Sequence, residues 1–126
     1  MNILIVDDEP EVAEVLAKSL SRQGHRTSTV NSGPDALARI EDSTVDAMFL
    51  DVSMPGMNGL EVLQEVKRMR PSLAVVVITG HATADELEEV KRLGAVDVIP
   101  KPAALTHYHQ AIERLDDRSR FRPVER

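Results

Sequence analysis

Short apolar runs alternate along this chain with longer segments whose apolar residues follow helical spacing. The runs have the length of β-strands, and the pattern predicts strands at residues 2–6, 26–30, 46–50, 73–78 and 96–99. The first, third and fourth runs are nearly continuous and rich in branched residues, which is typical of central parallel strands covered on both faces. The second run alternates polar and apolar residues and is expected at a sheet edge. The whole pattern predicts five strand–helix units.

Apolar stripes are clearest in the first and the last helical segments. After Pro10, which the first turn of a helix tolerates, the stripe consists of Val12, Val15, Leu16 and Leu20. In the last segment it consists of Leu105, Tyr108, Ile112 and Leu115. We expect each stripe to face the core. Gly24 and Gly94 follow helical segments, at the place where a left-handed closing residue is expected.

The alternation of strands and helices predicts an α/β fold. Right-handed crossovers place helices on both faces of a parallel sheet, which makes a doubly wound, three-layer α/β/α sandwich. With 126 residues, the chain has room for one ordinary domain, which we assign to residues 1–116. Residues 117–126 are rich in arginine but also carry carboxylates, so we expect a solvated, charged C-terminal tail rather than a binding arm.

Composition and charge narrow the classes of function. The sequence has no cysteine, which excludes disulfides and thiolate metal sites and fits a reducing compartment, and we expect the protein in the cytoplasm. Its apolar runs fall far short of the roughly 20 residues that span a bilayer, so no membrane partner is expected. The formal net charge of -6 argues against direct binding of nucleic acid, which needs a basic surface.

Polar residues follow the predicted strands at the edge where an open parallel sheet binds its ligands. They are Asp7, Asp8 and Glu9 after the first strand, Asp51 after the third, Thr79 and Gly80 after the fourth, and Lys101 after the fifth. Two carboxylates about 4 Å apart repel by about 4 kcal/mol at an effective dielectric near 20, and a hard cation removes that penalty. Oxygen ligands favour Mg²⁺, with Mn²⁺ as the alternative.

These residue types together predict phosphoryl chemistry. Asp51 is the predicted nucleophile, since carboxylates form acyl-phosphate intermediates. Asp7, Asp8 and Asp51 would hold the cation, while the Lys101 ammonium and the Thr79 hydroxyl, with Gly80 beside them, would hold the remaining phosphoryl oxygens. Each residue taken singly also has a structural explanation, such as a helix cap, a turn or surface charge. Their coincidence at adjacent strand ends favours one shared site.

Four segments carry a resemblance to a known family: ILIVDDEP at 3–10, LDVSMPGMNG at 50–59, VITG at 77–80 and GAVDVIPKP at 94–102. In this order they resemble the receiver domain of two-component response regulators, over about residues 1–116. The resemblance implies a flavodoxin-like sheet with strand order 2-1-3-4-5. It also implies that Asp8, Asp51 and the backbone carbonyl of Ser53 bind Mg²⁺ directly, that Asp7 acts partly through water, and that the Lys101-Pro102 bond is cis.

The resemblance also implies the partners. The phosphoryl donor would be a sensor histidine kinase or a phosphotransfer protein, and the target a downstream protein or an effector domain. The face formed by the fourth helix, fifth strand and fifth helix would carry the signal, and a homodimer through that face is possible. If this face pairs symmetrically, its contacts should be isologous.

One position departs from the family pattern. Receivers usually carry an aromatic residue three positions before the lysine, and here that residue is Val98. A valine cannot bury or expose an aromatic face, so we expect switching by displacement of helices and loops. Ser53 and His81 stand two positions after Asp51 and Thr79, where receivers tune the lifetime of the phosphorylated form. His81 would order a water molecule or cap the loop.

Three functions from different classes fit these residues. The first is a phosphorylation-controlled switch that catalyses only its own phosphorylation and dephosphorylation. The second is a constitutive protein-binding or dimerisation module cut from, or lacking, its effector domain. The third is a Mg²⁺-dependent phosphatase or phosphotransferase, a class that normally places a second aspartate where this chain has Ser53. The intact acidic set favours the first.

Overall fold

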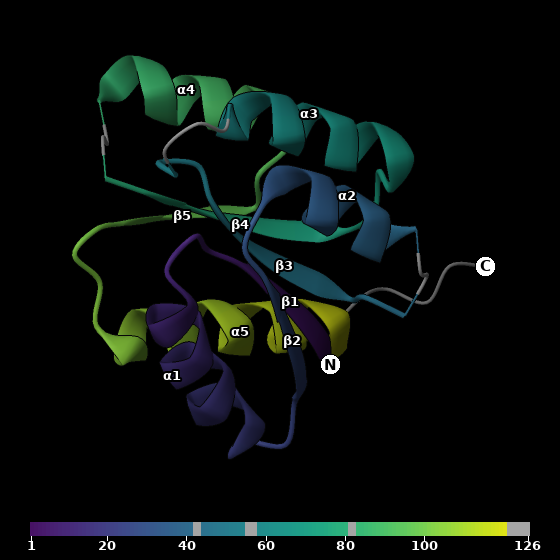
Figure 1. Cartoon of the computed structure of the whole chain (residues 1–126), viewed down its shortest axis with the longest axis vertical. Coiled ribbons are helices and arrows are strands. Elements are labelled where there is room, and N and C mark those ends of the chain that lie inside the picture. Colours follow the sequence, from purple (N-terminus) through teal and green to yellow (C-terminus); the bar gives the residue numbers. More distant parts are fainter. Residues whose placement is uncertain (42–43, 55–57, 81–82, 121–126) are drawn as a thin grey trace.

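The computed structural model describes residues 1–41, 44–54, 58–80 and 83–120, the last five of them by backbone alone. Five parallel strands form one sheet in the order β2-β1-β3-β4-β5 (Figure 1). The strands are β1 (Asn2–Val6), β2 (Arg26–Val30), β3 (Ala47–Asp51), β4 (Ala74–Thr79) and β5 (Asp97–Pro100). The helices are α1 (Pro10–Ser21), α2 (Gly33–Ile40), α3 (Gly59–Met69), α4 (Ala84–Arg92) and α5 (Leu105–Arg120). The predicted α/β fold and the strand order are confirmed.

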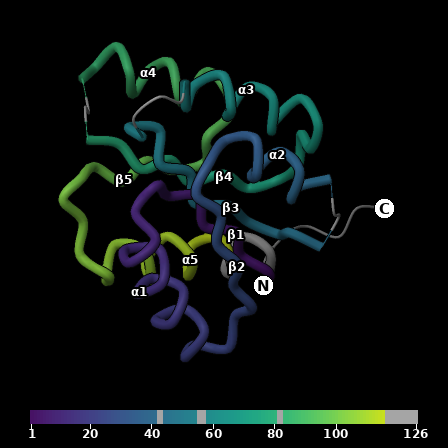
Figure 2. Tube along the Cα trace, viewed as in Figure 1, coloured from purple at the N-terminus to yellow at the C-terminus, as the bar shows by residue number. Residues whose placement is uncertain are grey.

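Helices cover both faces of the sheet, as Figure 2 shows, with α2, α3 and α4 on one side and α1 and α5 on the other. Successive strand residues point to opposite faces, so each central strand supplies both cores. Within β1, Leu4 and Val6 belong to the cluster on the side of α2, α3 and α4, whereas Ile3 and Ile5 belong to the cluster on the other side. This division explains why the central strands read as continuous apolar runs.

The strand ends differ from the prediction by one residue at the places that matter for function. Asp51 is the last residue of β3 and pairs with Ile78, and Thr79 is the last residue of β4 and pairs with Pro100. We predicted that both residues follow their strands. The backbone ladder continues through them, because the neighbouring strand still supplies a partner at that level. Both side chains therefore stand on regular, hydrogen-bonded backbone.

The apolar stripes of α1 and α5 are only partly as predicted. Leu16 and Leu20 are buried, but Val12 and Val15 are 44% and 56% exposed, and Leu105 is 41% exposed. The buried face of α1 is centred on Ala13, Leu16 and Leu20, so Val12 and Val15 fall beside it. Together with Leu105 they line a hollow of about 350 Å³ between the beginnings of α1 and α5.

Local signals place the helix ends. Gly24 and Gly94 have the predicted positive φ angles, 94° and 104°. Asn58 caps α3 by accepting hydrogen bonds from the first backbone N–H groups of the helix. Across the parts of the chain that the structure describes, we find no helix with the length and apolar character needed to cross a bilayer.

Candidate functional site

Three carboxylates converge at the carboxyl ends of β1 and β3. Asp7 and Asp8 directly follow β1, and Asp51 ends β3. Asp7 is 4% exposed, Asp51 is fully buried and Asp8 is half-buried. One oxygen from each of the three lies within 4.8 Å of the others. The parallel arrangement of β1 and β3 produces this cluster, because it brings both strand ends to the same edge of the sheet.

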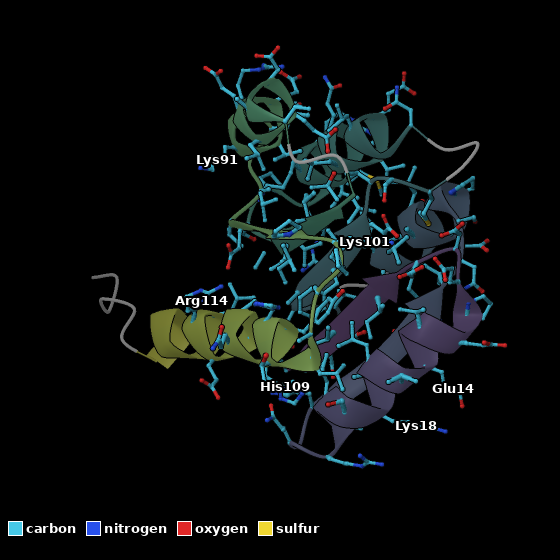
Figure 3. The ribbon with its side chains drawn as sticks, turned by 90° about the vertical axis from the view of Figure 1, so that its left-hand side faces the viewer. Glu14, Lys18, Lys91, Lys101, His109 and Arg114 are labelled. Carbon is cyan, nitrogen blue, oxygen red and sulfur yellow. The ribbon has the colours of Figure 1, made fainter. Side chains whose placement is uncertain are left out.

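Lys101 reaches this cluster from the segment after β5. Its Nζ donates a hydrogen bond to Oδ2 of Asp51 at 2.5 Å. Its backbone N–H donates to the carbonyl of Thr79 at 2.8 Å, which ties the residue to the end of β4. Figure 3 shows Lys101 in the middle of the molecule, between the two helical layers. The expected cis bond between Lys101 and Pro102 is present.

The two oxygens of Asp51 have different partners. Oδ2 accepts from Lys101, while Oδ1 accepts from the backbone N–H of Ser53 at 2.9 Å and from its hydroxyl at 2.7 Å. Gly80 lies near Ser53, because a Cβ added at Gly80 would stand 3.7 Å from the Ser53 hydroxyl oxygen. These contacts fix the orientation of the buried carboxylate.

The charges of the cluster change the proton affinity of its members. Burial raises the pKa of Asp7, and the negative charges of Asp51 and Asp8 add to this rise, although a hydrogen bond from the Glu9 backbone and the charge of Lys101 oppose it. Burial alone would lower the pKa of Lys101, but its bond to Asp51 and the nearby carboxylates outweigh burial and raise it. The lysine is therefore a firmly protonated cation in an acidic pocket.

Thr79 lies at the neighbouring strand end and is 1% exposed. Its hydroxyl donates a hydrogen bond to Oε1 of Glu86, in the first turn of α4. Sequence reasoning missed Glu86. The spacing of Thr83 and Glu86 matches a helix capping box, which is a signal for a helix start. It did not indicate that the glutamate side chain reaches back to Thr79.

Val98 and His81 are the remaining positions for which the sequence predicted a role. Val98 is half-buried and packs against the cluster on the side of α2, α3 and α4. It also lines, with Leu87 and Lys91, a hollow of about 440 Å³ between α4 and β5. His81, which was predicted to order a water molecule or cap a loop, lies outside the described residues.

Comparison with known proteins agrees with this geometry. Residues 3–113 match the family described as response regulator receiver domain. A response regulator receiver protein of Anaeromyxobacter is 40% identical over 102 residues, which cover 81% of this chain and 43% of that protein. The DNA-binding transcriptional regulator NtrC of Salmonella typhimurium is 32% identical over 112 residues, which cover 89% of this chain and 24% of that regulator. This chain thus spans less than half the length of either relative.

Solved structures show the same fold. A CheY-like response regulator receiver domain protein from Methanospirillum hungatei has a TM-score of 0.87 and 27% identity, and the match covers 94% of this chain and 96% of that chain. The fold, the strand order, the acidic strand ends and the family match over residues 3–113 lead to one conclusion. The chain belongs to the response regulator receiver domains of two-component signalling systems.

Proposed function

We propose that Asp51 accepts a phosphoryl group in a Mg²⁺-dependent reaction and that this modification switches the protein-interaction surface of the domain. The observation that carries the proposal is the contact of Lys101 with a fully buried Asp51 inside a cluster of three carboxylates. A buried aspartate that meets both an ammonium and further carboxylates is poorly explained as a structural ion pair. It is well suited to bind a cation and a phosphoryl group side by side.

The donor set fits Mg²⁺. The three carboxylates stand close enough to share one ion. Burial raises the pKa of Asp7, and the repulsion from Asp51 and Asp8 adds to that rise. We assign direct contacts to Asp8, Asp51 and the carbonyl of Ser53, with Asp7 acting partly through water. When bound, the ion would neutralise carboxylate and phosphoryl charge and so allow an anionic donor to approach.

The chain's own residues then perform the transfer. A carboxylate oxygen of Asp51 attacks phosphorus, the new O–P bond forms as the P–N bond of a donor phosphohistidine breaks, and the departing imidazole keeps the electron pair and takes a proton from solvent. Lys101 exchanges its contact with Asp51 for one with a phosphoryl oxygen. The Thr79 hydroxyl donates a hydrogen bond to another phosphoryl oxygen.

The donor we propose is a histidine kinase or a phosphotransfer protein. In support, the exposed Val12, Val15 and Leu105 form an apolar hollow between α1 and the segment that follows Lys101. A small phosphoester has no use for such a surface, whereas a protein donor can bury it while it presents its phosphohistidine to Asp51.

The output we propose uses the face of α4, β5 and α5, either toward a downstream protein or effector domain or in a symmetric homodimer. Val98 replaces the usual aromatic residue on this face. Because valine has one stiff torsion and no ring to rotate, displacement of α4 and its loops would carry the signal. In support, a hollow lined by Leu87, Lys91 and Val98 lies between α4 and β5, so the contact between these elements is not fully packed.

The burial of Asp7 in the acidic cluster leads to a prediction about the stability of the protein and its binding of Mg²⁺. Because burial raises the pKa of Asp7 in the folded state, the stability this residue contributes is full below the ordinary aspartate pKa of 3.8 and is lost as pH rises through the higher folded pKa. We therefore expect Asp7→Asn to stabilise the metal-free protein at pH 7 by about 1 kcal/mol, or about 4 °C of Tm. Below pH 3.8 the gain should disappear.

Thermal unfolding with and without Mg²⁺ measures this effect. Excess Mg²⁺ should raise the Tm of the wild type and raise that of Asp7→Asn less. The difference between the two Tm values should therefore narrow, or its sign should reverse. Glu11→Gln, in an exposed position on α1, is the charge-matched control and should respond to Mg²⁺ like the wild type. Equal responses of wild type and Asp7→Asn would contradict a role for Asp7 in the metal site.

Phosphorylation by acetyl phosphate tests the proposed function itself. With Mg²⁺, the intact mass of the wild type should rise by one phosphoryl group, and chelation or Asp51→Asn should abolish the rise. An unchanged mass in the wild type would favour the constitutive binding module. Sustained release of phosphate from small phosphoesters would favour a phosphatase, although the Ser53 hydroxyl at the position of a second carboxylate offers no general acid.

A further inference from the structure

The hydrogen bond between Thr79 and Glu86 joins the proposed phosphoryl site to α4. Thr79 ends β4 and is buried, while Glu86 is half-buried in the first turn of α4. A carboxylate accepts hydrogen bonds and donates none, so the threonine hydroxyl is the donor. The backbone of Glu86 is itself fixed, because its N–H donates to the Thr83 hydroxyl at 3.1 Å.

A hydroxyl group has a single proton to donate. The Thr79 proton cannot be shared fully between Glu86 and a phosphoryl oxygen on Asp51, so the two hydrogen bonds exclude each other. We propose that Glu86 is a positioning residue that holds the Thr79 hydroxyl away from the phosphoryl site and must release it when Asp51 is modified. This inference rests on the proposed phosphorylation of Asp51.

The release has a consequence for α4. Once Thr79 turns to the phosphoryl group, the Glu86 carboxylate loses its donor and faces the lone pairs of the threonine oxygen. Among the described side chains of α4, only Val90 is fully buried, whereas α3 buries Val62, Leu63 and Val66 along with Gly59. A helix held by so little apolar burial moves at low cost. Glu86 therefore offers a link from Asp51 to the α4 face that needs no aromatic residue at position 98.

The affinity for a phosphoryl analogue measures this competition. Beryllium fluoride with Mg²⁺ forms a tetrahedral adduct on a carboxylate, and ¹⁹F NMR or calorimetry gives its dissociation constant. We expect Glu86→Ala to tighten binding about ten-fold, which corresponds to about 1.4 kcal/mol. The Tm of the free protein should stay equal or fall, because the free form loses a hydrogen bond. A merely structural role would weaken binding and stability together.

Three further variants separate the hydrogen bond from charge. Glu86→Asp keeps the charge in the first turn but shortens the side chain, and should tighten binding as Glu86→Ala does. Asp85→Ala removes an exposed charge from the same turn and should change affinity less than about two-fold. In a Thr79→Val background, Glu86→Ala should have no effect, whereas in a Thr79→Ser background, which keeps the hydroxyl, the gain should persist.

The outcomes are distinct. If the wild type binds no beryllium fluoride, the proposed function fails. If the wild type binds it but Glu86→Ala and Glu86→Asp leave the affinity unchanged, the proposed role of Glu86 is wrong. An equal gain in affinity from Glu86→Ala in the Thr79→Val background, or an equal gain from Asp85→Ala, would assign the effect to charge alone. Either result would also overturn the proposed role of Glu86.

Discussion

Replacing Lys101 by alanine should lower the rate at which acetyl phosphate modifies Asp51 by at least about 100-fold, the usual cost of removing one preorganised donor from a charged transition state. The ammonium contacts Asp51 directly and stays protonated because the surrounding carboxylates raise its pKa. Initial rates from intact mass at saturating Mg²⁺ measure the effect. Lys91→Ala, which removes an exposed charge from α4, is the control and should leave the rate unchanged.

The same substitution should destabilise the metal-free protein. Without Lys101, the buried Asp51 carboxylate keeps its repulsion from Asp7 and Asp8 and loses its cationic partner, which costs about 1–3 kcal/mol. Adding Asp51→Asn to Lys101→Ala should recover most of this loss, because the uncompensated charge is then gone. Denaturant unfolding of the two single variants and the double variant tests this coupling. Additive effects would show that Lys101 does not compensate Asp51.

Substituting Gly59 by alanine should give the largest loss of stability of any small change near the site. A Cβ at this position would lie 2.4 Å from the Cα of Val52 and 2.5 Å from its Cβ. Because the closest atom is backbone, α3 or the segment after Asp51 must shift, and overpacking of this kind costs about 1–3 kcal/mol. The shift should also slow phosphorylation, since the displaced segment includes Ser53.

Gly80→Ala is the matched control for this change. Among the described residues beyond its chain neighbours, its Cβ would meet only the Ser53 side chain, at 3.7 Å or more, and the backbone of Gly80 has no positive φ. We therefore expect its Tm to stay within about 2 °C of the wild type, against a fall of at least about 4 °C for Gly59→Ala. Equal Tm values for the two variants would mean that α3 and Val52 do not constrain position 59.

The sequence predicted most of the fold because the chain's local pattern and its tertiary structure agree. The runs at β1, β3 and β4 are continuous since helices cover both sheet faces, and this pattern is visible without coordinates. The convergence of Asp7, Asp8, Asp51 and Lys101 followed from the rule that parallel strands end at one edge. The strand order was predicted on other grounds, because the resemblance to receivers implied it and periodicity alone did not.

Side-chain direction and long-range pairing were harder to predict. Val12, Val15 and Leu105 have helical spacing, but whether they are buried depends on how α1 and α5 tilt against the sheet. The hydrogen bond from Thr79 to Glu86 depends on how the first turn of α4 lies against the end of β4, and no periodic pattern in the sequence indicates this placement. The roles assigned to Asp51, Thr79, Gly80 and Lys101, and to Ser53 as a metal ligand, stay predictions.

Chemical trapping of the modified residue tests the central claim most directly. After reaction with acetyl phosphate and Mg²⁺, borohydride reduces an aspartyl phosphate to homoserine, and peptide mass spectrometry then identifies the position. We predict homoserine at position 51 alone, and none when Mg²⁺ is chelated. Homoserine at another aspartate, or at none in a folded, Mg²⁺-loaded protein, would contradict the account.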